Sequence, residues 1–434
     1  MALVMVLASI AILAVFVADM FESTSTSHAI AAQQRDRLQA EYMARSGLNL
    51  SRVLMSRQNA NALTALVTPF YQQMLQSQPP SSLPLHLAAH EILLPFCNYD
   101  ESTAVSQEAA FTLADAKGFG DNPGTCEIIA VSENSKINVS KPLSSAGDIA
   151  RESVAEQMFG LMGGFQAESP YDPLFEQPDA HGNFHTRLDV VSALIDWWDE
   201  DTQRTVFDPG AREVTTAAGE DDIYSTLDDP YQVRNAAFDS LEELRLVRGI
   251  GDDFWATFIE PEPDDPRRRT VTIYGSGLVN VNEARARVLL TRACAILTSP
   301  QSLCEDVLEA AKFEELVNTL RAQFPLPVFA NPHLFVEFLS GNGNIFQLLQ
   351  GYLATAGLET LMFTPISPTP QEAQALNRWF VADARIVAFQ IDGFAGRGRV
   401  QVSAIINNDD RWNPPPPNAG SMPELGVFHH YRID

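Results

Sequence analysis

The first 18 residues, MALVMVLASIAILAVFVA, contain no charged side chain, and Ser9 is the only polar one. As an α-helix, a segment of this length spans about 27 Å, close to the hydrocarbon thickness of a bilayer. Apolar residues continue at helical spacing after Asp19, and no proline interrupts the chain before Pro69. The sequence therefore predicts one helix of about 55 residues, in which residues 1–18 cross a membrane and the remainder is amphipathic.

A cleaved secretory signal is the alternative for such an N-terminus. It requires a basic segment before the apolar one and small residues at a cleavage site. No Lys or Arg precedes Arg35, and the helical pattern continues through that residue. We therefore expect a retained single-pass anchor.

The body of the chain is strongly acidic, with a formal net charge of −26 from 55 acidic and 29 basic residues. Because nucleic-acid affinity comes mostly from Lys and Arg that neutralise phosphates, this balance argues against a polyanionic partner. The stretch SLEELRLVRGIGDDFW, residues 240–255, nevertheless has the pattern of a helix-hairpin-helix, a motif that often binds DNA phosphates. Its two arginines, Arg245 and Arg248, are outnumbered by four acidic neighbours. We expect no nucleic acid partner; a periplasmic DNA-handling protein of a pilus or competence apparatus that uses the hairpin is the alternative.

The four cysteines suit an oxidising compartment on the far side of the membrane. They fall into two local pairs, Cys97 with Cys126 and Cys294 with Cys304, although four cysteines permit three connectivities. Their spacings match no zinc motif. We expect structural disulfides, and four free buried thiols are the alternative.

The rest of the chain divides into strand-like and helical stretches. Strand-like stretches are expected at 92–96, 110–114, 126–131, 379–391, 396–409 and 424–434. Helical segments are expected between them, at 145–162, 188–202, 281–297 and 303–323. Strands, a helical block and strands again indicate a helical insertion in a sheet domain, so the predicted fold class is α+β. The predicted domains are 1–18, 19–140, 141–326 and 327–434.

An anchor that continues without a break into an amphipathic helix is typical of type IV pilin-like subunits. The chain also contains, in order, KINVSK, LIDWWDEDT, GEDDIYSTLDDPYQVRN, SLEELRLVRGI and YGSGLVNVNEARARVLL. Together with the apolar N-terminus these motifs cover most of the chain, and they resemble the general secretion pathway protein K family, GspK. This family comprises the large minor pseudopilins of type II secretion systems. The resemblance implies a pilin-like long helix and antiparallel sheet with a large inserted α-helical domain, whose helix-hairpin-helix (SAM-like) elements serve as protein scaffold.

The resemblance also implies a function without catalysis. The expected protein caps the tip of a type II secretion pseudopilus and supports export of folded periplasmic proteins across the outer membrane. Its expected partners are the pseudopilus and other minor pseudopilins, GspI-like and GspJ-like. The expected location is the inner membrane through residues 1–18, with the bulk of the chain in the periplasm.

The family is made as a prepilin that a peptidase cuts after a glycine, and the residues just after that cut resemble ALVMVLASIAIL. Met1 is therefore expected at the processed N-terminus. Most pilins carry Glu at the fifth mature position, where Met5 stands here, and the family shares this absence. A carboxylate in hydrocarbon is costly unless it is paired, so a subunit without it suits the end of a filament.

Acidic residues gather after the tryptophan-bearing segment and again about twenty residues later. Ca²⁺ takes about six to eight oxygen ligands, and carboxylates supply both the ligands and the charge. The resemblance implies calcium in the inserted domain, and we expect the ion at Asp199, Asp201, Glu220 and Asp221. A solvated acidic loop is the alternative.

Motifs for catalysis are weak. His181 and His185 are four residues apart, but the intervening Gly182 and Asn183 disfavour a helix and no Glu follows as in HExxH. The GSG at 275–277 does not extend to the GxSxG of a nucleophile elbow. We therefore expect no catalytic residues.

Overall fold

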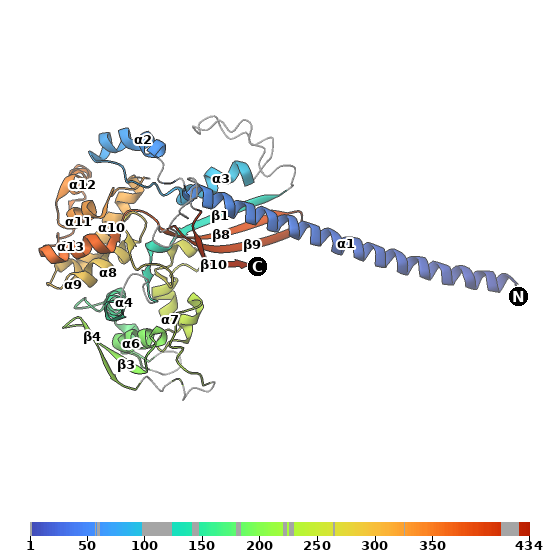
Figure 1. Ribbon diagram of the computed structural model, residues 1–434, viewed down its shortest axis with the longest axis horizontal. Coiled ribbons are helices and arrows are strands. Elements are labelled where there is room, and N and C mark those ends of the chain that lie inside the picture. The colour runs from blue at the N-terminus through green and yellow to red at the C-terminus, as the bar shows by residue number, and fades with distance from the viewer. Residues whose placement is uncertain are drawn as a thin grey trace, which may run out of the picture.

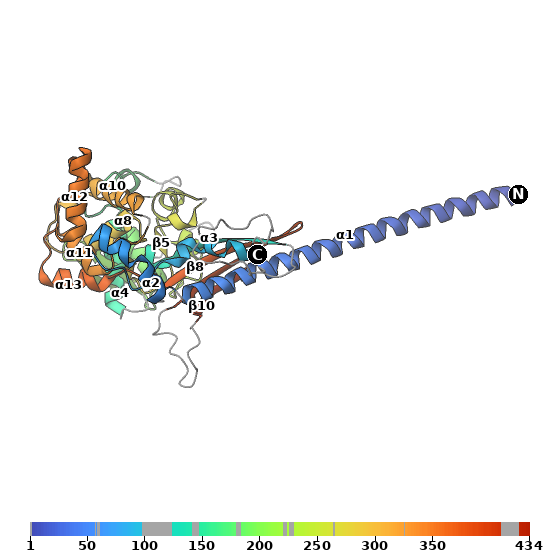
Figure 2. The ribbon, with the colours of Figure 1, turned by 90° about the horizontal axis from the view of Figure 1, so that it is seen from above.

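The computed structural model describes residues 2–56, 58, 61–97, 124–140, 147–178, 184–219, 224, 230–263, 265–324, 326–408 and 425–434. Helix α1, Ala2–Ser56, projects from a compact body, and the N-terminus lies at its far end (Figures 1 and 2). Its 55 residues confirm the predicted uninterrupted helix.

The body contains a four-stranded antiparallel sheet in the order β1-β8-β9-β10. Its strands are β1, Thr125–Ser132; β8, Ile386–Ala395; β9, Gly398–Asn407; and β10, Val427–Ile433. Strand β1 pairs directly with β8, with Cys126 opposite Gly393, although most of the chain separates them in sequence. The helical elements between residues 147 and 379 therefore form an insertion between two adjacent strands, which confirms the predicted α+β fold class.

The second half of α1 packs on one face of this sheet (Figure 1). Ala40, Ala44, Leu48 and Ser51 recur at helical spacing and are almost fully buried there. Because three of these four side chains are small, the helix backbone can approach the strands closely.

Glycines on the sheet complete this close approach. A Cβ built on Gly393 of β8 would lie 2.1 Å from the Ala40 carbonyl oxygen and 2.8 Å from the Ala44 nitrogen. A Cβ on Gly398 of β9 would lie 2.6 Å from the carbonyl carbon of Asp36. Both clashes are with backbone atoms, so only glycine allows the helix to lie at this depth.

A disulfide lies beside the contact between α1 and the sheet. Helix α3, Ala89–Cys97, ends at the Cys97–Cys126 bond, which links it to β1. Gly47 of α1 faces this bond, since a Cβ there would lie 3.2 Å from Cys126 Sγ. The second expected bond, Cys294–Cys304, lies in the helical domain. Both predicted local pairings are confirmed.

The inserted domain packs around one large apolar core that extends from Ile137 to Phe380. Its helices are α4, Gly147–Leu161; α5, Pro173–Glu176; α6, Arg187–Trp198; α7, Asp252–Phe254; α8, Ala286–Ile296; α9, Ser302–Glu305; α10, Val307–Gln323; α11, Pro332–Leu339; α12, Gly343–Ala356; and α13, Pro370–Trp379. A separate helix, α2, Asn61–Phe70, follows α1. The short strands are β2, Ile137–Asn138; β3, Gln203–Asp208; β4, Glu213–Ala218; β5, Val271–Thr272; β6, Val279–Asn280; and β7, Phe380–Val381.

Two sequence predictions of secondary structure are wrong. Residues 92–96 belong to helix α3 rather than to a strand, because Ala89, Leu93 and Cys97 are buried at a spacing of four residues. The stretch 303–323 is two helices, because Asp306 ends α9 and its side chain caps α10 by accepting from the Leu308 N–H (2.8 Å). The expected strand at 110–114 lies outside the described residues.

The predicted return to the sheet at residue 327 is also wrong. Residues 332–379 carry helices α11, α12 and α13, which share the core of the inserted domain, and the four-stranded sheet resumes at β8. Two start signals for these helices were readable: Asn331 before Pro332, and Thr369 with Glu372, which form a capping box.

Gly393→Ala tests the docking of α1. We expect the free energy of unfolding to fall by about 1–3 kcal/mol, because the new methyl meets backbone rather than a movable side chain. The measurement is guanidinium unfolding of the full chain in detergent micelles.

Gly351→Ala is the control, because Gly351 lies within helix α12 and a Cβ there would meet no atom within 4 Å. This variant should gain about 0.4–1 kcal/mol. Equal stability of the two variants would contradict close docking at Gly393.

Candidate functional site: anchor helix, hairpin and acidic cluster

The first part of α1 is apolar and exposed. Leu3, Phe16 and Phe21 are 76%, 65% and 77% exposed. Within the part of the chain that the structure describes, α1 is the one helix long and apolar enough to cross a membrane, by length and composition. Burying each such side chain is worth about 1.5–3 kcal/mol, so this segment is stable only in lipid or against other helices.

Two hydroxyls, one in this segment and one just after it, are satisfied within the helix. The Ser9 hydroxyl donates to the Met5 carbonyl (2.8 Å), and the Thr24 hydroxyl donates to the Met20 carbonyl (2.7 Å). Polar hydrogens need internal partners where water is absent. The start of α1 therefore has the chemistry of a membrane anchor.

The stretch 240–255 forms the expected hairpin in a shortened form. The 3-10 helix η5, Leu241–Leu246, leads through Gly249 to α7 and the π-helix η6, Trp255–Ile259. Gly249 has φ +80°, which glycine adopts without strain. A Cβ there would lie 2.6 Å from Val190 of α6, so the turn packs against that helix.

The arginines of the hairpin interact with protein groups. Arg245 pairs with Asp252, and its guanidinium lies 4.2 Å from the centre of the Trp255 ring. The Arg248 Nε–H donates to His185 Nδ1 (3.2 Å). These contacts occupy the cations that a DNA backbone would require and support the scaffold interpretation. His181, the other histidine of the HGNFH stretch, lies outside the described residues.

The tryptophan-bearing helix α6 ends at the acidic cluster. Both Trp197 and Trp198 are buried, and the Trp197 Nε1–H donates to Glu243 of the hairpin (3.0 Å). The Asp196 carboxylate accepts from the Thr205 N–H of β3 (2.7 Å). The cluster therefore begins inside the domain, where an uncompensated charge is costly.

Asp199 and Asp201 share one arginine. The Arg151 Nε lies 3.2 Å from Asp199 Oδ2, and its Nη2 donates to Asp201 Oδ2 (2.5 Å). Asp199 is almost fully buried, and Asp201 Oδ1 accepts from the Gln203 N–H (2.8 Å). The Arg151 guanidinium therefore neutralises part of the negative charge of this cluster.

The other two predicted ligands, Glu220 and Asp221, lie outside the described residues. Within the described ranges, no group of three or more His, Cys, Asp or Glu side chains could hold a metal ion. The two described carboxylates are hard-cation ligands by type. Ca²⁺ would have to compete with Arg151 for Asp201 Oδ2 and take further oxygens from 220–223.

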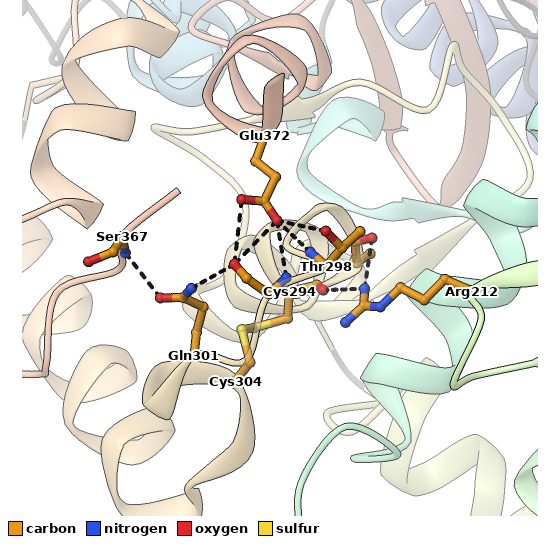
Figure 3. The surroundings of a disulfide bond; sticks show 9 residues. Arg212, Cys294, Thr298, Gln301, Cys304, Ser367 and Glu372 are labelled. Atoms are coloured by element: carbon orange, nitrogen blue, oxygen red, sulfur yellow. Dashed lines mark hydrogen bonds between the residues drawn. A yellow bond between two sulfur atoms is a disulfide. The ribbon is translucent and has the colours of Figure 1, made fainter. Parts of the chain in front are cut away.

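A hydrogen-bonded junction lies beside the Cys294–Cys304 bond (Figure 3). The Glu372 carboxylate of α13 accepts from the backbone N–H groups of Thr298 (2.7 Å), Ser299 (3.2 Å) and Thr369 (2.7 Å). The Arg212 guanidinium donates to the Cys294 carbonyl (2.8 Å). These contacts join α8, α13 and the β3–β4 hairpin.

No protein-family model and no curated protein matches the chain. Among solved structures, the chain is similar to one described as "The Crystal Structure of the GspK-GspI-GspJ complex from enterotoxigenic Escherichia coli Type 2 Secretion System". The similarity has a TM-score of 0.40 and 13% sequence identity, and it covers 86% of this chain and 98% of that chain. This is a distant likeness, and the function proposed below rests on the residues of this chain.

Several residues at these sites escaped the sequence analysis. Arg151 lies in α4, some fifty positions before the carboxylates it contacts, so no local pattern connects them. The sequence TPQE predicts a capping box that contains Glu372, but no local pattern predicts the hydrogen bonds of Glu372 to Thr298 and Ser299.

The Glu372 junction predicts a pH dependence of stability. Burial would raise the pKa of Glu372, but the N–H groups of Thr369, Ser299 and Thr298 lower that pKa from 4.5 to about 2. A lowered pKa in the folded state means that the stabilisation is present above pH 4.5 and is lost as the pH falls toward 2. In Glu372→Gln we expect a loss of about 1–3 kcal/mol at neutral pH and a shallower loss of stability on acidification.

Gln301→Ala is a non-titrating control in the same junction, since it removes the acceptor of the Ser367 N–H (3.0 Å). It should lower stability by a similar amount at every pH. The measurement is unfolding between pH 7 and 2. An unchanged pH slope in Glu372→Gln would contradict the assignment.

Proposed function

We propose that this protein is a minor pseudopilin that caps the tip of a type II secretion pseudopilus. It would be anchored in the inner membrane with its body in the periplasm, and it would support export of folded proteins across the outer membrane. Helix α1 carries this proposal. Its exposed apolar first part needs lipid or neighbouring helices, while its second part packs on one face of the sheet.

The position of the inserted domain supports a place at the tip. The helices of this domain lie beyond the end of α1 that is remote from the N-terminus (Figures 1 and 2). In a filament of parallel pilin-like helices, each further subunit must pack beside and beyond the previous one. A broad domain in that position obstructs such stacking, so one copy per filament is the expected stoichiometry.

The proposed partners are smaller pseudopilins whose helices lie beside α1. The exposed part of α1 outside the anchor offers apolar side chains, including Leu38 and Tyr42, which are 53% and 57% exposed. Such side chains at helical spacing suit packing against a partner helix.

Residues 20–434 should form a complex with the soluble parts of two smaller pseudopilins from the same secretion system. Leu38→Asp with Tyr42→Asp should weaken that complex at least tenfold, because it places charge in the helix interface. The folded state should tolerate both changes, since both side chains are exposed. Analytical ultracentrifugation gives the complex and its affinity.

Leu308→Asp is the matched control, because Leu308 is 70% exposed in the inserted domain. If only Leu308→Asp abolishes the complex, the partners bind the inserted domain and not α1. Many tagged copies along one filament would contradict the cap.

We further propose that Ca²⁺ binds the acidic cluster through Asp199, Asp201, Glu220 and Asp221. The two described carboxylates lie together and provide the correct ligand type, which supports the proposal. The ion would connect the end of α6 to the segment that follows β4. Arg151 is then a competing cation.

Chelation of Ca²⁺ should lower the melting temperature, and Ca²⁺ should restore it better than Mg²⁺. A ligand that binds only the folded state adds about 2.7 kcal/mol at a hundredfold excess over its Kd. Asp199→Asn should abolish this response. Arg151→Gln should enlarge it, because the competing guanidinium is gone.

Asp172→Asn controls for general destabilisation. Asp172 pairs with Arg187 (2.6 Å) in the same domain, away from the cluster, and this variant should keep the calcium response. A wild-type melting temperature that chelation does not change would identify the cluster as an arginine-neutralised acidic surface.

A further inference from the structure

A run of polar side chains is buried where the chain leaves the sheet for the inserted domain. The run connects β1 to β2 through a short 3-10 helix, η3, Glu133–Ser135. Glutamate and lysine are rarely buried unless they are paired, and both occur in it. Five consecutive residues are at most 8% exposed: Ser132, Glu133, Asn134, Ser135 and Lys136.

The Asn134 side chain connects this outgoing crossing to the point where the chain returns to the sheet. Its Oδ1 accepts from the N–H groups of Arg385 (3.0 Å) and Ile386 (3.1 Å), at the start of β8. Its Nδ2 donates to the Leu278 carbonyl (3.2 Å), directly before β6 of the inserted domain. One buried amide therefore bonds both crossings and the inserted domain.

Further polar contacts lie on either side of Asn134. The Lys136 ammonium donates to Glu133 Oε1 (2.7 Å), and the Thr272 hydroxyl of β5 donates to Glu133 Oε2. The Asn282 side chain, after β6, donates to the Ala382 carbonyl of the returning crossing (3.2 Å). Each of these bonds is directional, so together they favour one arrangement of the two crossings.

Apolar packing is incomplete between the sheet and the inserted domain. The buried apolar residues of the two parts form separate clusters, so no continuous apolar core joins them. A groove of about 170 Å³ also lies between Ala388 and Ser403 of the sheet and Leu241 of the hairpin. Because packing leaves this gap, the angle between the two parts depends on the hydrogen bonds at the crossings.

We propose that these bonds form a rigid joint that holds the inserted domain in one orientation relative to α1. The joint consists of Glu133, Asn134, Lys136 and Asn282, and Asn134 is its central positioning residue. A tilt of α1 is thereby passed to the inserted domain, and the two move as one body. Bending at the crossings leaves buried backbone groups without partners, which is costly. The joint is a property of this chain alone and is independent of the proposed cap function.

Double electron–electron resonance between two nitroxides measures this orientation. The four cysteines all lie in disulfides, so labels can be attached at Arg45→Cys of α1 and Glu315→Cys of α10, both exposed positions. The labelled full chain in detergent micelles should give one narrow distance distribution. Asn134→Ala should widen that distribution at least about twofold, because the two crossings lose their shared partner.

Asn331→Ala is the matched control. Asn331 caps α11 by accepting from the Leu334 N–H (3.1 Å), so its loss destabilises the inserted domain without affecting the joint. This variant should keep the narrow distribution. If Asn134→Ala does not fold, as judged by circular dichroism, Asn282→Ala replaces it, since Asn282 is only half-buried and its loss should also widen the distribution.

Three results would overturn the joint. A broad distribution in the labelled chain without further substitution would mean that the two parts already move independently. An unchanged width in the joint variant would mean that packing alone sets the orientation. Equal widening in Asn331→Ala would attribute the effect to general loss of stability. Because the isolated chain is measured, failure of the pseudopilin complex leaves each of these results unaffected.

Discussion

The body of the protein depends on how closely a long helix approaches a sheet. Gly393 and Gly398 let the backbone of α1 lie against β8 and β9, and the small side chains of Ala40 and Ala44 complete the contact from the helix. This contact fixes the direction of the whole helix, because a rod of 55 residues magnifies any change of angle at its base. The exposed apolar first part of α1 is therefore held at a defined angle to the sheet.

The insertion between β1 and β8 can be large because those strands form a complete antiparallel pair. The pairing places the end of β1 next to the start of β8, so the inserted domain begins and ends at neighbouring positions. The hydrogen bonds of the sheet do not depend on the size of that domain. Arginines then connect elements within the inserted domain. Arg151 contacts two carboxylates, and Arg292, which is fully buried, lies 4.0 Å from the centre of the Trp379 ring. The planar, delocalised guanidinium is suited to such desolvated positions.

Prediction from the sequence succeeded where the signal was local or long and periodic. The uninterrupted helix followed from the absence of proline and from apolar residues at helical spacing, and the two disulfides followed from sequence proximity. It failed at residues 92–96, where a short apolar run fits a strand as well as a helix, and at 332–379, where the helices are marked mainly by their caps. Two of the four predicted calcium ligands, Asp199 and Asp201, pair with Arg151, which is too distant in sequence for any spacing rule to connect with them.

By itself, the sequence determined the long N-terminal helix with its apolar first part, the order of strand, helix and strand, the cysteine pairs and the acidic balance that disfavours polyanions. These features depend on composition and on spacing along the chain. Only the tertiary structure decided that Gly393 contacts Ala40, that Arg151 lies between Asp199 and Asp201, and that Asn134 bonds the backbone at the start of β8. Those partners are far apart in sequence, and only the packing of helices on strands and on each other brings them within reach.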